Sequence, residues 1–457
     1  MMRISWSFSS LAVAAAFALA ACGGTAAPSA APASSAPAAA ASKPTAATSA
    51  SAKPAASASA KPVASAAASV KPAASAGASA AVATGTPYKI GFLISLTGPL
   101  ASFGVSDKNA IDIEVKKLNA GGGIDGHPVE IVMEDDASDP SKGVVAYKKI
   151  VDQKPIAMIG PVFSSVSLAV IPMSMQAKLP QITVAAVEAQ VTPVKDKKYI
   201  FMTAPSTSVM APSLLSYMQR SNIKKYAVLH DPGAYGMAGP EALKANASKY
   251  GIENVADETY QLSDTDHTSH LTKINSSGAE ALVVWGSGSG PQIIAAKNYK
   301  SLGMKMPILF SAAAADIDGF VKPAGAAAEG AIMNTNKLQV ADYLLPSDPS
   351  KKVLDDFIPR YRQAAGIEPN EFAANAYDAF NMLVNAIRMA KSTDGDKIVD
   401  ALEKTKFDGA DGTFEYTPEN HVGMTMNALA MVQIKDGKLV PVKPNCDGCF
   451  DTTVTRG

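Results

Sequence analysis

Short apolar runs alternate with longer amphipathic runs along most of this sequence, and the alternation constrains the fold more than any other feature. The apolar runs that predict strands are Tyr88–Ile94, Val129–Met133, Ile156–Ile159, Leu179–Val184, Tyr226–His230, Ala281–Trp285 and Pro307–Phe310. The runs that predict helices are Val105–Leu118, Ser141–Gln153, Ser164 to about Lys178, Gly239–Tyr250 and Pro291–Leu302. This order predicts mainly parallel sheets with helices on both faces. Because the rhythm restarts at Tyr226, we expect two similar α/β halves, with ligands bound outside the carboxyl ends of the strands.

The part of the chain from Pro87 to Gly457 is too long for one hydrophobic core, since single cores stop growing near ~250–300 residues. The whole chain carries 41 basic and 41 acidic residues. The sequence shows no basic patch, no nucleic-acid motif and, after residue 86, no apolar run long enough to cross a bilayer. We therefore expect no nucleic-acid partner.

The first 21 residues read as a targeting segment, with Arg3 as the positive charge and Leu11–Leu19 as the apolar core. The sequence Leu19-Ala-Ala-Cys22-Gly resembles a bacterial lipobox, in which the cysteine is acylated and becomes the new N-terminus. This predicts a lipoprotein signal peptide (1–21) and an extracytoplasmic protein, in the periplasm or at the cell surface, anchored through Cys22. The alternative is an ordinary cleaved signal followed by a chance cysteine.

Residues 22–85 are rich in Ala, Ser and Pro, with Lys-Pro recurring at Lys43, Lys53, Lys61 and Lys71. Such a segment cannot bury enough apolar surface to offset chain entropy, so it predicts a disordered tether. A flexible coil of roughly 60 residues would span about 45 Å.

The C-terminal segment contains Cys446 and Cys449 in a C-x-x-C arrangement. Outside the cytoplasm this spacing predicts a small disulfide within a tail of residues 446–457. A redox motif would need a following helix, and a zinc site would need two further ligands.

The stretch from Ile156 to Ser167 predicts a ligand site. A buried strand ends at Gly160-Pro161, and Ser164, Ser165 and Ser167 begin a helix. The first N–H groups of a helix have no internal partners and its dipole is positive there, which favours an anion. The alternative is that Ser164 only caps the helix.

Several motifs follow one another in an order that resembles the leucine/isoleucine/valine-binding protein family. They are Ile90-Gly-Phe-Leu93, Thr97-Gly-Pro99, Asn119-Ala-Gly-Gly-Gly-Ile-Asp-Gly126, Glu134-Asp-Asp-Ala-Ser-Asp-Pro140, Ile159-Gly-Pro161, Asp231-Pro-Gly-Ala-Tyr-Gly236 and Asp264-Thr-Asp266. That family comprises extracytoplasmic solute receptors of branched-chain-amino-acid-type ABC importers. The resemblance covers Tyr88 to about Lys443.

The resemblance implies a type I periplasmic-binding fold, in which two doubly wound α/β lobes are joined by three hinge crossings and close on a ligand between them. Lobe 1 would comprise residues 86–204 and 335–421, and lobe 2 residues 205–334 and 422–445. The implied partners are a small-molecule ligand and the ABC permease and ATPase subunits. The resemblance further implies a monomer with no cofactor.

The resemblance also implies ligand-binding positions. Ser165 matches the serine that meets the ligand's carboxylate, and Ala185 and Ala186 match positions that present backbone groups to it. Val187 stands where the amino-acid binders have a threonine, so one donor is missing. Tyr235 matches an aromatic residue of the second lobe.

Phe103 falls where an aromatic residue often covers the ligand, although core packing is an equal alternative.

The loop after Trp285 departs from the family's pattern. The amino-acid binders place an acid there for the ligand's ammonium, but this loop is Gly286-Ser-Gly-Ser-Gly290. A buried ammonium without a partner is costly, and Trp285 and Ser287 suit a flat apolar ligand body better. We therefore expect a small aromatic or branched aliphatic carboxylic acid. A branched-chain amino acid or amide remains the alternative, because Asp231, Asp316 or Glu188 could supply a carboxylate.

An enzyme and a ligand sensor are the two other functional classes to compare with a solute receptor. The five histidines are scattered as His127, His230, His267, His270 and His421. They form neither H-E-x-x-H nor part of a nucleophile elbow, so we expect no catalytic residues and no enzyme. His267 and His270 lie near Asp264 and Asp266, but a solvated loop is favoured over a metal site. A ligand sensor without transport is the other alternative.

Overall fold

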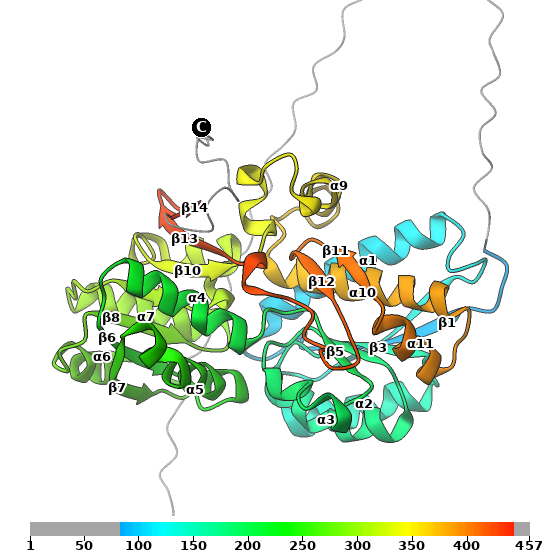
Figure 1. Ribbon diagram of the computed structural model, residues 1–457, viewed down its shortest axis with the longest axis horizontal. Coiled ribbons are helices and arrows are strands. Elements are labelled where there is room, and N and C mark those ends of the chain that lie inside the picture. The colour runs from blue at the N-terminus through cyan, green and yellow to red at the C-terminus, as the bar shows by residue number, and fades with distance from the viewer. Residues whose placement is uncertain (1–82, 443–457) are drawn as a thin grey trace, which may run out of the picture. The chain divides into compact units, whose positions relative to one another are not determined.

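The computed structural model describes residues 83–442, and they form two α/β lobes (Figure 1). The first lobe is built on a five-stranded sheet with the strand order β2-β1-β3-β4-β5, in which all neighbours are parallel. Its strands are β1 (Tyr88–Ile94), β2 (Val129–Asp135), β3 (Ala157–Ile159), β4 (Gln181–Thr183) and β5 (Ile200–Met202). Its helices are α1 (Ala101–Ala120), α2 (Pro140–Asp152), α3 (Ser164–Ala177), α9 (Pro349–Ala365), α10 (Glu371–Ala390) and α11 (Gly395–Leu402). Helix α1 packs against α10, and α2 packs against α3 on the other side of the sheet.

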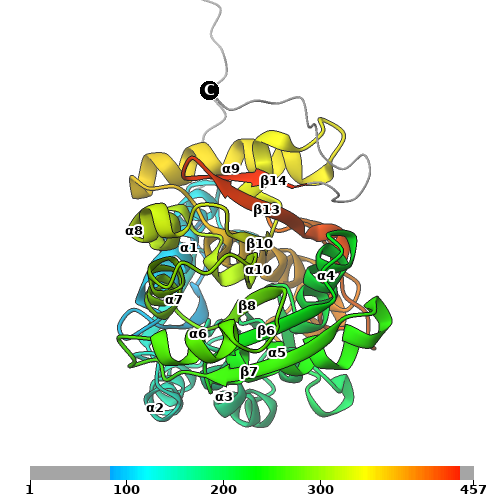
Figure 2. The same cartoon turned by 90° about the vertical axis from the view of Figure 1, so that its left-hand side faces the viewer.

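The second lobe is built on a seven-stranded sheet with the order β14-β13-β10-β9-β8-β6-β7. Its strands are β6 (Lys225–His230), β7 (Glu253–Thr259), β8 (Ala281–Trp285), β9 (Ile308–Phe310), β10 (Ile332–Thr335), β13 (Ala430–Lys435) and β14 (Lys438–Pro441). Only β13 and β14 run antiparallel to their neighbours. Its helices are α4 (Thr207–Arg220), α5 (Ala234–Ala247), α6 (Thr268–Asn275), α7 (Ser289–Ser301) and the single turn α8 (Lys322–Ala324). Figure 2 shows α4 and α5 on one side of β6 and β8, and α6 and α7 on the other.

The chain passes between the lobes three times: between β5 and α4, between β10 and α9, and between β12 (Thr413–Glu415) and β13. Strand β12 forms a two-stranded hairpin with β11 (Lys406–Asp408). This arrangement confirms the predicted α/β fold with two lobes and three crossings. The residue boundaries given above for the lobes remain a prediction.

Local sequence explains how the predicted site is positioned. Strand β3 is buried throughout and ends at Ile159, where Gly160 turns the chain with a φ of +85°. A Cβ at this glycine would lie 2.1 Å from the carbonyl oxygen of Leu93, so no larger residue fits. The turn delivers the chain directly into the start of α3 at the carboxyl edge of the sheet.

Two helices begin four or five residues earlier than predicted. Helix α1 begins at Ala101 rather than Val105, and α5 begins at Ala234 rather than Gly239. The run that starts α5 contains Gly236, Gly239 and Pro240, which read as helix breakers in sequence. Gly239 is required by packing, because a Cβ there would lie 2.1 Å from the indole ring of Trp285.

Several predictions fall outside the described residues: the signal peptide, Cys22, all of the tether before residue 83, Cys446 and Cys449. Gly85, the last residue of the predicted tether, donates its N–H to the carbonyl of Gly126 over 2.9 Å. Within residues 83–442, none of the helices combines the length and apolar character that a membrane span requires.

Candidate functional site

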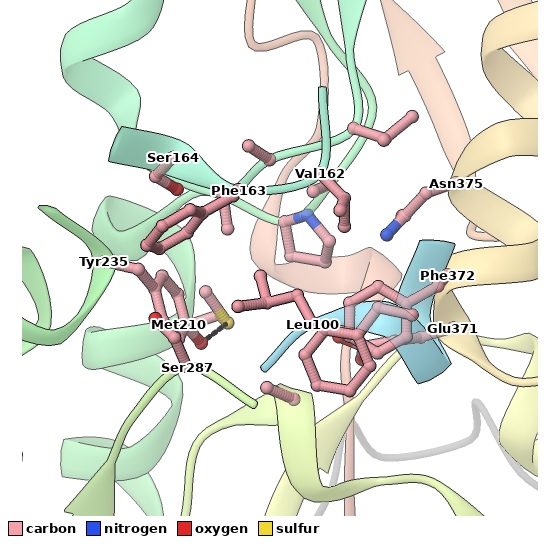
Figure 3. Close-up of a pocket in the computed structure, with 17 residues that line it drawn as sticks. Leu100, Val162, Phe163, Ser164, Met210, Tyr235, Ser287, Glu371, Phe372 and Asn375 are labelled. Carbon is pink, nitrogen blue, oxygen red and sulfur yellow. Dashed lines mark hydrogen bonds between the residues drawn. The ribbon is translucent and has the colours of Figure 1, made fainter. Parts of the chain in front are cut away.

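A pocket lies between the two lobes and draws residues from both of them (Figure 3). Its walls are mainly apolar. The lining residues are Leu100, Phe103, Val162, Phe163, Ser164, Val184, Ala185, Ala186, Ala204, Pro205, Met210, Tyr235, Ser287, Ala313, Glu371, Phe372 and Asn375. The cavity is small in this conformation, at about 40 Å³. A larger solute therefore needs the lobes or the lining side chains to move apart before it can enter.

Ser164 lies at the first position of α3 and faces this pocket with 3 % of its surface exposed. The N-cap of α3 is Phe163, and the helix has no side-chain cap. The hydroxyl of Ser164 is thus not used as a helix cap, which was the alternative reading of this serine. The site retains the uncapped N–H groups and the positive dipole end of α3.

Ser165 is not among the lining residues. Its Oγ accepts a hydrogen bond of 3.1 Å from the backbone N–H of Ala234, the first residue of α5 in the second lobe. The contact joins two lobes through residues 69 positions apart in sequence. Ser165 therefore contributes a hydrogen bond between the lobes in this conformation.

The segment after β4 lines the pocket with Ala185 and Ala186, whereas Val187 is buried outside it. The N–H of Ala185 donates to Thr183 Oγ1 over 3.2 Å, and its carbonyl accepts from Gln190 Nε2 over 3.0 Å. These backbone groups are already engaged within the protein, so they are poorly placed to serve a ligand as well.

The second lobe contributes Tyr235 and Ser287. The Tyr235 hydroxyl donates to Met210 Sδ over 3.8 Å, drawn as the dashed line in Figure 3. Trp285 is fully buried and does not line the pocket; its ring packs against that of Tyr235, with 5.6 Å between the ring centroids. The N–H of Ser287 donates to Asp231 Oδ2 over 2.6 Å, which fixes the loop after β8.

The first turns of α10 bring three residues into the pocket that the sequence analysis did not single out: Glu371, Phe372 and Asn375. The ring of Phe372 stacks on that of Phe103 with 3.8 Å between centroids, so Phe103 both lines the pocket and packs in the wall. In sequence, Glu371 is marked only as an acid in the first turn of an alanine-rich helix, preceded by Asn370 as N-cap.

Glu371 brings a carboxyl group to the pocket from the first turn of α10. The residue as a whole is 5 % exposed, and Oε2 has no hydrogen-bond partner among residues 83–442. Burial, and secondarily the charge of Asp316, raises the pKa of Glu371 from 4.5 to about 8. The raised pKa favours the protonated form, which can donate as well as accept a hydrogen bond.

Asp231, Asp316 and Glu188 are the acids that the sequence offers as possible partners of a ligand's ammonium group. Asp231 accepts N–H groups from Gly233 and Ser287, and Asp316 accepts from Gly319 N and Asn370 Nδ2. Burial is the largest cause that raises the pKa of both Asp231 and Asp316. Glu188 begins a short 3-10 turn. None of these three is among the lining residues.

The histidines near Asp264 and Asp266 are used in local packing. His270 Nδ1 lies 2.8 Å from Glu258 Oε2, and the His267 ring packs 4.5 Å from that of Tyr260. Asp266 accepts from the backbone N–H of Thr268 at the start of α6. Among residues 83–442, no three His, Cys, Asp or Glu side chains are grouped as metal ligands would be.

Comparisons with known proteins agree with this architecture. The family model described as "Periplasmic binding protein" matches residues 87–438. The Leu/Ile/Val-binding protein homolog 3 of Brucella melitensis biotype 1 is 28% identical over 357 residues, which cover 77% of this chain and 92% of that protein.

Two solved structures illustrate the likeness in three dimensions. An extracellular ligand-binding receptor from Rhodopseudomonas palustris HaA2 superposes with a TM-score of 0.73 at 27% identity, over 78% of this chain and 100% of that one. The branched-chain amino acid transporter substrate binding protein LivJ from Streptococcus pneumoniae, in complex with isoleucine, gives a TM-score of 0.68 at 25% identity, over 78% of this chain and 98% of that one. The chain belongs to the periplasmic binding protein family, the family of the Leu/Ile/Val-binding proteins.

Proposed function

We propose that this protein is the extracytoplasmic solute receptor of an ABC importer and captures a small carboxylate-bearing ligand with a mainly apolar body. The observation that carries the proposal is the pocket between the lobes, whose walls are apolar apart from a few polar groups, with Ser164 at the start of α3. The permease and ATPase subunits are the proposed partners. Residues 22–85 are proposed as the tether to a lipid anchor at Cys22.

The ligand's carboxylate is proposed to meet the start of α3. Within residues 83–442 no lysine or arginine lines the pocket, so the anion would be held by the uncapped N–H groups of the helix and by the Ser164 hydroxyl. A charge-assisted hydrogen bond of this kind is worth about 1.5–3 kcal/mol. Phe103, Met210 and Tyr235 would then contact the apolar body of the ligand.

Binding is proposed to close the lobes. The hydrogen bond from Ala234 N–H to Ser165 Oγ spans the lobes and can form only while they are together. A ligand between Ser164 and Tyr235 contacts both lobes only when they are closed. These contacts would stabilise the closed arrangement relative to the open one.

A branched-chain amino acid is the second candidate, favoured by one observation. The carboxyl group of Glu371 faces the pocket and could meet an ammonium group if it ionised. The Brucella melitensis relative is named a Leu/Ile/Val-binding protein homolog, and the Streptococcus pneumoniae structure holds isoleucine.

A thermal-shift screen over aliphatic acids, aromatic acids and amino acids tests the proposal. We expect at least one carboxylate-bearing compound to raise the melting temperature, and we expect its amide or alcohol analogue not to do so. Stabilisation by compounds without a carboxylate, and by none with one, would contradict the proposal. Permease and ATPase genes beside the gene of this protein would favour transport over sensing.

A further inference from the structure

One turn of α10, from Asn375 to Asp378, holds segments that cross between the lobes. Thr203, in the first crossing, donates from Oγ1 to the carbonyl of Asn375 over 3.0 Å. The carboxyl group of Asp378 accepts the N–H groups of Ala410 over 2.7 Å and of Asp411 over 2.9 Å. These two donors lie in the turn between β11 and β12, and β12 leads into the third crossing.

Asp411 also fastens the second crossing. Asn336 is the first residue after β10 and donates from Nδ2 to Asp411 Oδ1. The N–H of Lys337 donates to the carbonyl of Asp411 over 3.3 Å. Tyr416, at the start of the third crossing, donates its hydroxyl to the carbonyl of Met202 at the end of β5 over 2.8 Å. The three crossings, which together form the hinge between the lobes, are thus attached to one another and to α10 around Asp378 and Asp411.

The side chains of Asp378 and Asp411 are fully buried and hydrogen-bonded to each other. Carboxylate groups only accept hydrogen bonds, so this bond requires a proton on one of the two. Asp378 already accepts two N–H groups, whereas Asp411 Oδ2 has no other partner among the described residues. A proton on Oδ2 of Asp411 therefore supplies the donor that the pair lacks.

The surroundings of the pair favour retention of this proton. Burial is the largest cause that raises the pKa of both carboxyl groups, and the charges of Asp378 and Glu371 raise the pKa of Asp411 further. Lys337 does not neutralise the pair, because its Nζ pairs with Asp348 over 2.8 Å. The charged side chains on the β11–β12 hairpin are exposed; they are Lys406, Asp408 and Glu415.

The other elements that pack most closely on α10 bring no unpaired buried cation to the pair, within residues 83–442. These elements are α1, α11, β3, β4 and the 3-10 turn Leu338–Tyr343. The one half-buried cation on them, Lys108, pairs with Asp112 over 2.5 Å. Their other buried or half-buried titratable groups are Asp107, Glu114, Tyr343 and Asp396.

We propose that Asp378 and Asp411 form a proton-binding site that fastens the hinge: the shared proton holds the second crossing on α10 and favours the closed lobes. When this proton passes to water, two adjacent carboxylates remain in a buried site and repel each other. The turn of residues 409–412 then moves away from Asp378 and releases Asn336. Because the closed arrangement binds the proton more tightly, closure weakens as the pH rises.

Hydrogen exchange read by mass spectrometry tests the fastening on the ligand-free protein. The peptides that report it span residues 332–344 and 405–416. Asp411→Asn keeps the acceptor for Asn336 and replaces the proton with an amide donor, so it should behave as a permanently protonated pair. At about pH 6 the wild type and this variant should exchange alike. At about pH 9 the wild type should exchange at least about fivefold faster than the variant at the same pH.

Small-angle X-ray scattering of the same samples reads out the lobes. The radius of gyration of the wild type should increase between about pH 6 and about pH 9, and that of Asp411→Asn should not. Asp400→Asn is the matched control, because Asp400 is an exposed acid on α11, and it should follow the wild type. Glu371→Gln should also follow the wild type, which separates the hinge pair from the acid in the pocket.

A melting curve checks that each variant folds. Asp378→Asn also leaves one carboxyl group in the pair, so it should lose the pH response in the same way and can replace Asp411→Asn if that variant does not fold.

Three outcomes overturn the inference: no pH response of the wild type in either measurement, the same response in Asp411→Asn, or loss of the response in Glu371→Gln. No ligand is needed, so these outcomes are independent of the ligand proposed above.

Discussion

Ser164 and Ser165 are neighbours in sequence, but their side chains have different environments. The first faces the pocket from the start of α3, and the second accepts a hydrogen bond from the other lobe. Ser164→Ala should therefore weaken binding of the acid that gives the largest thermal shift by about tenfold, through loss of a charge-assisted hydrogen bond. Ser165→Ala should weaken it by about threefold or less, because only a closed-state contact is lost. Calorimetry of both variants decides the order, and a larger loss for Ser165→Ala would reverse our assignment.

The carboxyl group of Glu371 should make stability depend on pH. Its pKa is raised from 4.5 to about 8, mainly by burial. Above pH 4.5 the unfolded chain loses this proton while the folded protein keeps it, so the unfolded state gains relative stability until about pH 8. Glu371→Gln has no proton to lose. Its free energy of unfolding should therefore rise relative to the wild type between pH 4.5 and pH 8, by on the order of a few kcal/mol.

Denaturant unfolding of the ligand-free protein at several pH values measures this difference. Glu419→Gln is the control, because Glu419 is an exposed acid far from the pocket in sequence. Its stability should run parallel to that of the wild type. Parallel curves for Glu371→Gln as well would mean that Glu371 is ionised in the folded protein.

Helix α5 and strand β8 are coupled by the contact between Gly239 and Trp285. A Cβ at Gly239 would lie 2.1 Å from the buried indole, so Gly239→Ala should destabilise the protein by about 1–3 kcal/mol. Gly290 near the start of α7 is the matched control, because a Cβ there meets nothing within 4 Å. Gly290→Ala should be neutral or slightly stabilising, since alanine favours helix. Thermal unfolding compares them, and equal melting temperatures would show that the Trp285 ring moves aside without cost.

At the scale of elements, the sequence predicts the strands and helices whose bounds depend on the local pattern of apolar residues. Strands β1 and β8 have the predicted bounds, because their apolar runs are buried and end at polar or glycine residues. The predicted start of α5, at Gly239, was wrong. The helix accommodates Gly236, Gly239 and Pro240 because of tertiary packing, which helix propensity does not describe.

The candidate site was only partly predictable, because tertiary packing also decides which residues line the pocket. Ser164 stands next to a strand that predicts its position, whereas Glu371 and Asn375 are distant in sequence from the other polar lining residues. Its place in the pocket depends on the second crossing between the lobes, which returns the chain to pack α10 on α1. No local pattern in residues 371–375 predicts that return.

At the scale of the whole molecule, the proposal joins the binding lobes to a membrane through the N-terminal segment. Because Cys22 follows a sequence that resembles a lipobox, Cys22→Ser should release the protein from the membrane or leave its precursor uncleaved. Membrane fractionation with a mass measurement of the N-terminus reads out both results. A processed Cys22→Ser protein that stays in the membrane fraction would rule out this anchor.

The central claim is that the pocket between the lobes captures a carboxylic acid by its carboxylate and apolar body. Calorimetry with matched pairs tests it most directly: 4-methylvalerate against leucine, and phenylpropionate against phenylalanine. We predict that the acid of at least one pair binds more tightly than its amino acid, because the loop after Trp285 offers no carboxylate and burial raises the pKa of Glu371, which disfavours its ionised form. The margin should be about tenfold or more, since an unpaired ammonium in a dry pocket is costly. Tight binding of the amino acids with no binding of the acids would contradict this account and make Glu371 the ionised partner of the ligand's ammonium group.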